Sequence, residues 1–176
     1  MDNIALPVIY LSILLALLSA TGFVIFRQIL KTRRTENALS RLQKKLTSDK
    51  GTTQEYYELG SIYLDKKVYS QSVVMFQKAI KAAEQEPEEN VAPIYNALGF
   101  AHFAQEQYDL AIRQYKEAIR FAPDYTTALN NLAHAYERKN LTAQALQTYE
   151  QVLESEPKNV TAQRRAESLR RRLVTS

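Results

Sequence analysis

The sequence contains no cysteine, and only 4 of its 176 residues are glycine and 5 are proline. Without cysteine the chain has no disulfide, no zinc–thiolate site and no thiol nucleophile, which fits a reducing compartment. So few turn-forming residues exclude a sandwich or barrel built from many short strands. Because 45% of the residues are hydrophobic, a packed core is still possible. These features favour an all-α fold of one modest domain.

Charge is absent from the first part of the chain. No charged residue lies between Asn3 and Phe26, a run of 24 residues rich in Leu, Ile, Val and Phe. As an α-helix it would rise about 36 Å, enough to cross a hydrocarbon core of about 30 Å. We therefore predict a transmembrane anchor over residues 1–26. A cleaved signal peptide is the alternative, but a basic start and a small-residue cleavage site would mark one, and the chain shows Asp2 and neither feature.

Four basic residues follow the apolar run: Arg27, Lys31, Arg33 and Arg34. The positive-inside rule places them, and the chain after them, on the cytoplasmic or equivalent side of the membrane. Cations beside an anionic leaflet are attracted to it, so we expect this membrane-flanking group to contact anionic lipid of the bilayer. A solvated linker face without lipid contact is the alternative.

Residues 27–52 are predicted to form a basic juxtamembrane helix and linker. Leu39, Leu42 and Leu46 recur at a spacing that places them on one face of a helix. This spacing indicates a helical stalk that packs on the globular part or on a partner helix. A break in the helix is expected between residues 47 and 53.

The net charge changes sign twice along the chain. Residues 27–50 carry +6, residues 51–157 carry −6 and residues 158–176 carry +5. An acidic body therefore lies between two basic flanks. Since a nucleic-acid-binding domain is usually basic over its body, we expect no nucleic-acid partner.

One pattern occurs three times in the acidic body. Each copy has a small residue among large apolar ones and a second small residue further on: Gly60 and Ser72, Gly99 and Ala111, Ala133 and Ala145. The pattern resembles the tetratricopeptide repeat, a helix–turn–helix unit of about 34 residues. The resemblance implies three helix pairs, at residues 53–86, 92–125 and 126–159. Small residues let the two helices of a pair approach closely, and neighbouring pairs stack to share a core.

Two features of the repeats depart from an even series. Unit one lacks a closing proline, and the acidic stretch 84–89 precedes unit two. We interpret this stretch as a lengthened second helix followed by a longer loop, which serves solubility or, alternatively, a basic partner.

The second helices carry polar residues suited to N-caps at Ser70, Asp109 and Thr142.

After the third unit, residues 160–176 are predicted to form a basic capping helix and tail. A solenoid needs an end helix with a polar outer face, and apolar residues recur along one side of this segment. Its five arginines decorate the helix. They are interpreted as a solvated surface; binding of acidic protein or anionic lipid is the alternative.

No catalytic pattern is present in the sequence. H-E-x-x-H, P-loop and dinucleotide-binding glycine motifs are all missing. The two histidines are His102 and His134. His102 occupies a core position of the repeat, and His134 has no second metal ligand at helical spacing. We therefore expect no enzyme activity, no catalytic residue, no metal and no cofactor.

The resemblance also implies a protein-binding groove lined by the first helix of each pair. Its lining positions carry Tyr57, Ser61, Leu64, Asn96, Phe100, Phe103, Asn130 and His134. Aromatic side chains on such a surface indicate protein binding, and carboxamides can bond the backbone of a bound peptide. The alternative is that the segment 31–46 or the C-terminal helix covers the aromatics. The Lys and Arg with which related repeats hold a chaperone's terminal carboxylate are missing, which argues against that mode.

The whole chain resembles one family in particular, the short membrane-anchored tetratricopeptide proteins of cyanobacteria and algal plastids that assist photosystem I assembly. The resemblance rests on the anchor, on the flank at residues 33–36, and on the motifs at residues 54–60, 95–101 and 130–136. It implies a non-catalytic single-pass thylakoid protein with cytoplasmic or stromal repeats that hold photosystem I subunits or assembly intermediates. The alternatives are a plasma-membrane location, a general targeting or translocation receptor, and an adaptor for another membrane complex.

Overall fold

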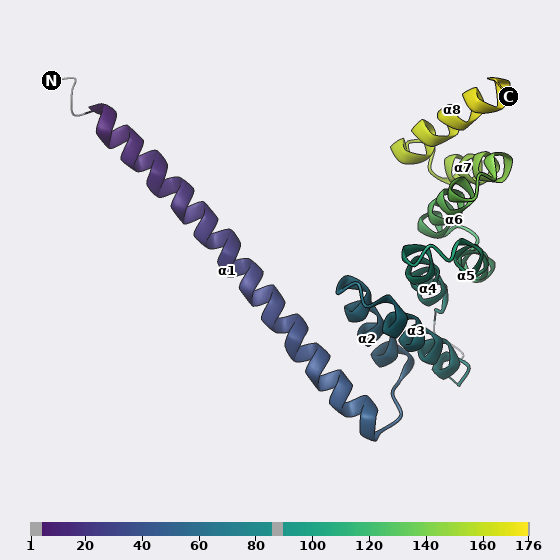
Figure 1. Ribbon diagram of the computed structural model, residues 1–176, viewed down its shortest axis with the longest axis horizontal. Helices are drawn as coiled ribbons and strands as arrows, with labels where there is room; N and C mark the ends of the chain where they lie inside the picture. The colour runs from purple at the N-terminus through teal and green to yellow at the C-terminus, as the bar shows by residue number, and fades with distance from the viewer. Residues whose placement is uncertain (1–4, 86–89, 176) are drawn as a thin grey trace. The chain divides into compact units, whose positions relative to one another are not determined.

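The structure, a computed structural model, describes residues 5–85 and 90–175. Within this part of the chain it consists of eight α-helices and contains no strand, which confirms the predicted all-α class (Figure 1). Residue contacts divide the chain into two units, with the boundary between Thr47 and Ser48. Each unit is described separately below.

The first unit is the helix α1 (Ala5–Ser48), which continues for 44 residues without a break. Among the described residues it is the one helix long and apolar enough to cross a membrane, and its apolar part is not buried within the protein. The hydroxyl groups of Ser12 and Thr21 donate to the carbonyls of Ile9 and Leu17, at 2.8 and 2.9 Å. These two hydroxyl groups therefore find their acceptors within the helix, as a spanning segment requires.

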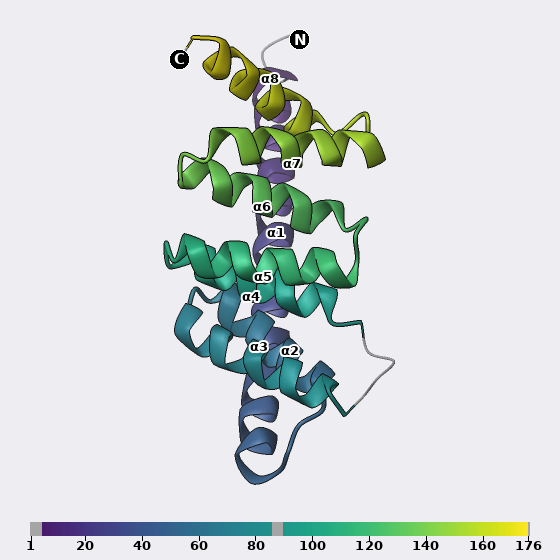
Figure 2. The same cartoon turned by 90° about the vertical axis from the view of Figure 1, so that its right-hand side faces the viewer.

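The second unit contains the remaining helices. They are α2 (Thr53–Asp65), α3 (Tyr69–Ala83), α4 (Ala92–Ala104), α5 (Tyr108–Phe121), α6 (Thr126–Arg138), α7 (Thr142–Ser155) and α8 (Val160–Thr175). Three antiparallel pairs, α2/α3, α4/α5 and α6/α7, stack in chain order and α8 closes the stack (Figure 2). The predicted solenoid of three helix pairs and a capping helix is thereby confirmed.

Two glycines let the helices of a pair touch. A Cβ atom added to Gly99 would lie 2.7 Å from the ring of Tyr115, and one added to Gly60 would lie 2.7 Å from the ring of Phe76. Ser72, the small residue opposite Gly60, donates its hydroxyl to the Gly60 carbonyl at 2.8 Å. Each aromatic ring thus lies directly on the backbone of the facing helix, and an added methyl group would force the ring or the helix to shift.

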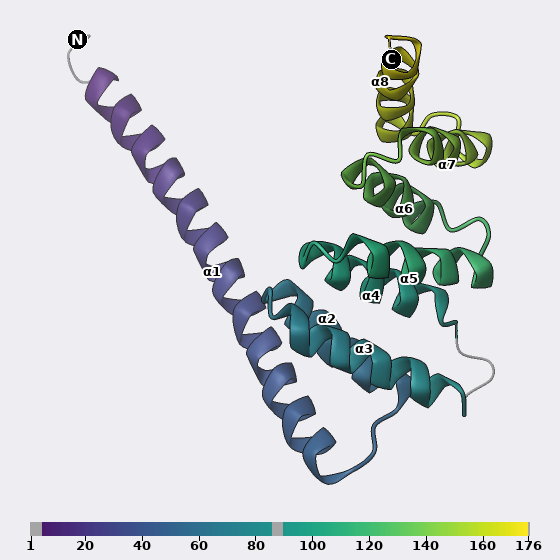
Figure 3. The same ribbon diagram turned by 45° about the vertical axis from the view of Figure 1, so that its right-hand side comes forward.

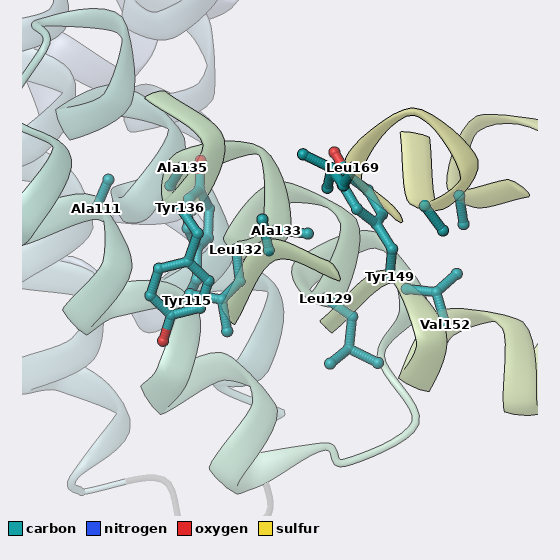
Figure 4. Packing of buried hydrophobic residues seen from close by; sticks show 13 residues of the cluster. Ala111, Tyr115, Leu129, Leu132, Ala133, Ala135, Tyr136, Tyr149, Val152 and Leu169 are labelled. Atoms are coloured by element: carbon teal, nitrogen blue, oxygen red, sulfur yellow. The ribbon is translucent and has the colours of Figure 1, made fainter. Parts of the chain in front are cut away.

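The core extends through the stack in two clusters. The first lies between the first two pairs and includes Phe76 and Leu98. The second runs from α5 to α8 and includes Tyr115, Tyr149 and Leu169 (Figure 4). Because one cluster joins residues of four successive helices, no pair in this part buries its apolar side chains alone.

The second helix of each pair begins differently from the prediction. Ser70 and Asp109 lie inside the first turns of α3 and α5, Thr142 is the first residue of α7, and none of these helices has a side-chain cap. The preceding turns pass through left-handed residues, namely Lys67, Glu106 and Asn140 with φ near 60°. The residue directly after each left-handed position becomes the N-cap, so the polar residues arrive one or two positions too late.

The end of the first pair agrees only partly with the predicted extension. α3 has 15 residues, one more than α5 and α7. The acidic stretch after it falls largely on residues 86–89, which lie outside the described part of the chain.

α8 ends the stack because its two sides differ. Ala162, Ala166 and Leu169 are buried in the second core cluster. Its opposite side is polar and exposed, including Gln163 and Glu167 at positions where the preceding first helices carry large apolar, aromatic or small residues. Apart from Val160 and Val174 near its ends, this side offers a further helix little apolar surface to pack on.

Arginines of α8 hold it to the helices beneath. Arg170 donates two hydrogen bonds to Glu150 of α7, at 2.7 and 3.2 Å. Arg165 lies 3.5 Å from Glu137 of α6. At least these two arginines therefore contact acidic residues of neighbouring helices, in contrast to the solvated surface predicted from the sequence for the arginines of this helix.

Candidate protein-binding face

The first helices of the three pairs, α2, α4 and α6, contact one another along one side of the stack. The second helices α3, α5 and α7 lie on the other side (Figures 1 and 3). We call the exposed and half-buried side chains of α2, α4 and α6 the first-helix face. All eight groove residues predicted from the sequence belong to these three helices.

A polar row crosses this face near the starts of the helices. The carboxamide oxygen of Asn96 on α4 accepts a hydrogen bond of 2.9 Å from Asn131 on α6. The amide nitrogen of Asn96 lies 3.5 Å from the hydroxyl of Tyr125, which precedes α6. Burial raises the pKa of Tyr125, with a further rise from nearby Tyr57 of α2 and an opposing effect of Asn96. Asn96, Tyr125 and Asn131 therefore form a polar row that joins the second and third repeats.

The structure places the two predicted carboxamides differently. Asn96 keeps a second N–H and a second lone pair beyond the bonds just named, so it can still bond a peptide. Asn130 donates to the Thr126 carbonyl of its own helix at 3.0 Å. Its side-chain oxygen is buried and has no partner among the described residues. Asn131, one position further on, is the residue that reaches the polar row.

An aromatic group occupies the same face near the helix ends. Phe103 of α4 lies between His134 of α6, at 4.9 Å between ring centroids, and Tyr108 of α5, at 5.3 Å. Arg138 stands 5.0 Å above the ring of Tyr108. Phe100 is 45% exposed. Within the second unit α8 packs on α7 and leaves Phe100 open.

His134 is uncharged at neutral pH. Burial lowers its pKa below the usual value; Arg165 and Arg138 act in the same direction and Glu137 acts against them. A neutral imidazole stacks on Phe103 as one more aromatic ring. The aromatic group therefore offers an apolar surface bordered by two arginines.

His102 differs from His134. It is 7% exposed, and its Nδ1 lies 2.7 Å from the side-chain oxygen of Gln107. This is the interior, hydrogen-bonded histidine that the sequence indicated. Among the described residues no three His, Cys, Asp or Glu side chains are grouped as metal ligands.

The contribution of α2 is smaller than that of α4. The ring of Tyr57 packs against Phe76 with centroids 5.7 Å apart. Ser61 donates its hydroxyl to the carbonyl of Tyr57 at 2.9 Å, so that donor is already used. Leu64 packs against the first core cluster. At this end Tyr57 carries a hydroxyl group for which the described residues supply no hydrogen-bond partner.

A small hollow of about 190 Å³ lies beside Tyr57, between the starts of α2 and α4. Its lining includes Thr53, whose hydroxyl is buried and has no partner among the described residues. The unused hydroxyl makes the hollow suited to a polar group or water at this end of the face.

Three residues of the polar row and the aromatic group were not predicted. Asn131 stands next to a predicted position, Tyr125 lies in the turn before α6, and Tyr108 belongs to a second helix. The repeat pattern assigns groove positions only within the first helices, so no signal in the pattern marks a turn or a neighbouring helix. Only the stacked structure shows that Asn131 and Tyr125 lie beside Asn96 and that Tyr108 lies beside Phe103.

Comparisons with known proteins agree with this architecture. The tetratricopeptide repeat profile matches residues 52–124 and 102–173. Among solved structures, YrrB, a tetratricopeptide protein with an unusual peptide-binding site, aligns with a TM-score of 0.67 at 25% identity over 79% of this chain and 69% of that one. MamA aligns with a TM-score of 0.64 at 27% identity over 70% of each chain. The chain is therefore a tetratricopeptide-repeat protein.

Relatives along the full length narrow the class. The ycf37 protein of Cyanophora paradoxa is 39% identical over 94% of this chain and 95% of its own. The chloroplastic protein PYG7 of Arabidopsis thaliana is 33% identical over 97% of this chain, which spans 56% of that longer protein. The chain belongs to the ycf37 and PYG7 family, which confirms the family predicted from the sequence. These comparisons indicate a protein-binding scaffold, and they point to no enzyme family.

Proposed function

We propose that this protein is a membrane-anchored, non-catalytic scaffold that holds photosystem I subunits or assembly intermediates on its first-helix face. The observation that carries the proposal is the exposed Phe100 beside the Phe103 aromatic group and the Asn96 polar row. The aromatic side chains can contact side chains of an extended polypeptide. The carboxamide of Asn96, which has hydrogen-bonding groups still unused, can bond the backbone of that polypeptide. Family membership supports the photosynthetic role.

The same proposal places α1 across the thylakoid membrane. Its apolar part is long enough to span and is not buried within the protein. Arg27, Lys31, Arg33 and Arg34 follow it, which favours repeats on the cytoplasmic or stromal side. A chloroplastic relative is consistent with this location. The scaffold would then act where membrane subunits are inserted and joined.

Affinity capture from thylakoid membranes in gentle detergent tests the role. Photosystem I polypeptides should be recovered with the wild-type chain. Recovery of many presequences or chaperones instead would indicate a general targeting receptor, and recovery of neither would count against an assembly role.

A variant pair tests the face itself. Phe100→Ala, alone and with Phe103→Ala, should reduce capture several-fold, because the apolar contact surface is lost. Leu173→Ala is the matched control, since Leu173 is 43% exposed and lies on α8, off the first-helix face. Equal capture by the Phe100 and Leu173 variants, with helicity unchanged in both, would show that the partner binds elsewhere.

A further inference from the structure

The second helices α3 and α5 carry most of the positive charge of the acidic body. Five of the nine Lys and Arg residues between 51 and 157 lie on these two helices, and all five are exposed: Lys78, Lys81, Arg113, Lys116 and Arg120. Lys78 and Lys116 reach toward the first helices, 5.8 Å from the ring centroids of Tyr56 and Tyr136, whereas the other three belong to the outward side of α3 and α5. Figure 2 turns this side toward the viewer, with α3, α5 and α7 one above the other. We call Lys81, Arg113 and Arg120 the outer basic face.

Little of this charge is neutralised within the described chain. Arg120 pairs with Glu117 at 2.7 Å. The other acid of α5, Asp109, is paired with Lys139 instead of with the face. Lys81 and Arg113 have no carboxylate partner among the described residues. The face therefore presents cations that are available to an anionic surface.

Exposed apolar side chains stand among the cations. Val74 of α3 is 45% exposed, and Leu110 and Phe121 of α5 are 42% and 48% exposed. They are separated from one another by polar residues instead of forming one continuous patch. Cations attract a protein surface to anionic headgroups, and apolar side chains beside them can enter the boundary between headgroups and acyl chains.

The second helix of the third pair, α7, lacks both the cations and the exposed large apolar side chains. α7 contains no Lys or Arg, and its outward residues include Gln147 and Glu154. Gln147 occupies the repeat position of Val74 and Arg113, which precede it by 73 and 34 residues. Since the three helices share one packing pattern, the repeat does not require the charge and apolar residues on α3 and α5.

We propose that the outer basic face is a second membrane contact, at which α3 and α5 rest on the anionic surface of the lipid bilayer. The inference rests on the proposed anchorage through α1, because a tethered chain meets the same bilayer at high effective concentration. Under that condition a few cations and three apolar side chains suffice for a contact that would be weak in free solution. An acidic protein surface is the competing occupant.

The cysteine-free chain allows a direct measurement. An environment-sensitive fluorophore is attached to the full-length protein at Val74→Cys, with Gln147→Cys as the matched control on α7. The protein is reconstituted in nanodiscs of phosphatidylcholine alone or mixed with phosphatidylglycerol, and quenching by a lipid-borne spin label is recorded. At position 74 quenching should be several-fold stronger in the anionic discs and should fall when salt is raised. At position 147 it should stay low in both.

A third label, at Leu18→Cys in the apolar part of α1, separates the possible failures. If position 18 is quenched in both lipids while positions 74 and 147 respond alike, the anchorage stands and the outer basic face is not a lipid contact. If position 18 is not quenched, the anchorage itself is wrong, and this inference falls with it.

Charge reversal completes the test. Lys81→Glu with Arg113→Glu should remove the anionic-lipid quenching at position 74, whereas Gln151→Glu on α7 should leave it unchanged. Helicity confirms that each variant folds. Protection of position 74 by a thylakoid extract, without quenching by lipid, would overturn the proposal in favour of an acidic protein partner.

Discussion

At the scale of single residues, close helix contact depends on glycine facing an aromatic ring. Gly99→Ala would place a methyl group 2.7 Å from the Tyr115 ring, and Tyr115 is 1% exposed and has no room to move. Alanine favours a helix by about 1 kcal/mol over glycine, but overpacking costs about 1–3 kcal/mol. We expect a net loss of about 1 kcal/mol in unfolding free energy, measured by urea denaturation.

A double-mutant cycle identifies the cause of that loss. In a Tyr115→Leu background the ring is absent, so Gly99→Ala should become neutral or stabilising through its helix propensity. An equal cost in both backgrounds would show that the ring contact is not responsible.

A second prediction at this scale concerns His134. Its pKa is lowered in the folded state, chiefly by burial, with Arg165 and Arg138 acting in the same direction and Glu137 opposing. The unfolded chain therefore binds this proton more readily. The contribution of neutral His134 to the stability of the folded state is fully present above the ordinary histidine pKa of about 6.5. It is lost as the pH falls below that value. The thermal unfolding midpoint should decline between neutral pH and about pH 5.

The control for this titration is His134→Phe, which keeps a ring against Phe103 but has no proton to bind. Its midpoint should depend less steeply on pH over the same range. If wild type and variant decline in parallel, other groups cause the loss of stability.

At the scale of the element, α8 determines where the repeat ends. Leu169 is 2% exposed and belongs to the core cluster that also holds Tyr149 and Val152. Leu169→Ala should lower the unfolding free energy by about 2–5 kcal/mol because it leaves a cavity under the cap. Leu173→Ala is the matched control; its side chain is 43% exposed, so a change below about 0.5 kcal/mol is expected. Similar losses for the two would mean that α8 frays from the stack.

The helices themselves could be predicted from the sequence because their packing is periodic. Gly60, Gly99 and Ala133 recur in register, and each marks the point where two helices touch. The starts of the second helices were mispredicted because each turn contains a left-handed residue, such as Glu106 with φ of 60°. The residue after it becomes the N-cap, one or two positions before the predicted polar residue. Residue type alone does not reveal that backbone conformation, since glycine, its usual marker, is absent there.

The candidate face was predictable to a different extent. Phe100 could be assigned to it because an aromatic residue at a position without a packing role is conspicuous. The partner of Asn96 could not be assigned, because Asn130 and Asn131 are adjacent and the packing of α6 on α4 decides which one reaches across. Tyr125 was missed since its position in a turn follows from stacking of the pairs.

At the scale of the whole molecule, positive and negative charge are distributed unevenly along the chain and over the two sides of the solenoid. The basic flank at residues 27–50, the acidic body at 51–157 and the basic end at 158–176 alternate along the chain. Within the acidic body the cations concentrate on the second helices of the first two pairs, away from the aromatic group. Under the proposed function, one side of the solenoid is thus left for protein and the other for lipid.

The orientation of the chain in the membrane is the remaining prediction at this scale. The proposed topology rests on the four cations after the apolar run and on their absence before it. A variant reverses this bias by Asp2→Lys and Asn3→Lys together with neutral replacement of the flank: Arg27→Gln, Lys31→Gln, Arg33→Gln and Arg34→Gln. Because the Lys and Arg bias near the ends of a span sets its orientation, a share of the chains should insert the opposite way.

Protease protection of a C-terminal tag in sealed membranes measures that share. Wild type and the single change Arg33→Gln should both leave the tag cleavable from the cytoplasmic or stromal side. In the reversed variant a protected fraction should appear, although Arg41, Lys44 and Lys45 remain to limit it. Full cleavage in the reversed variant would show that features outside the basic flank orient the protein.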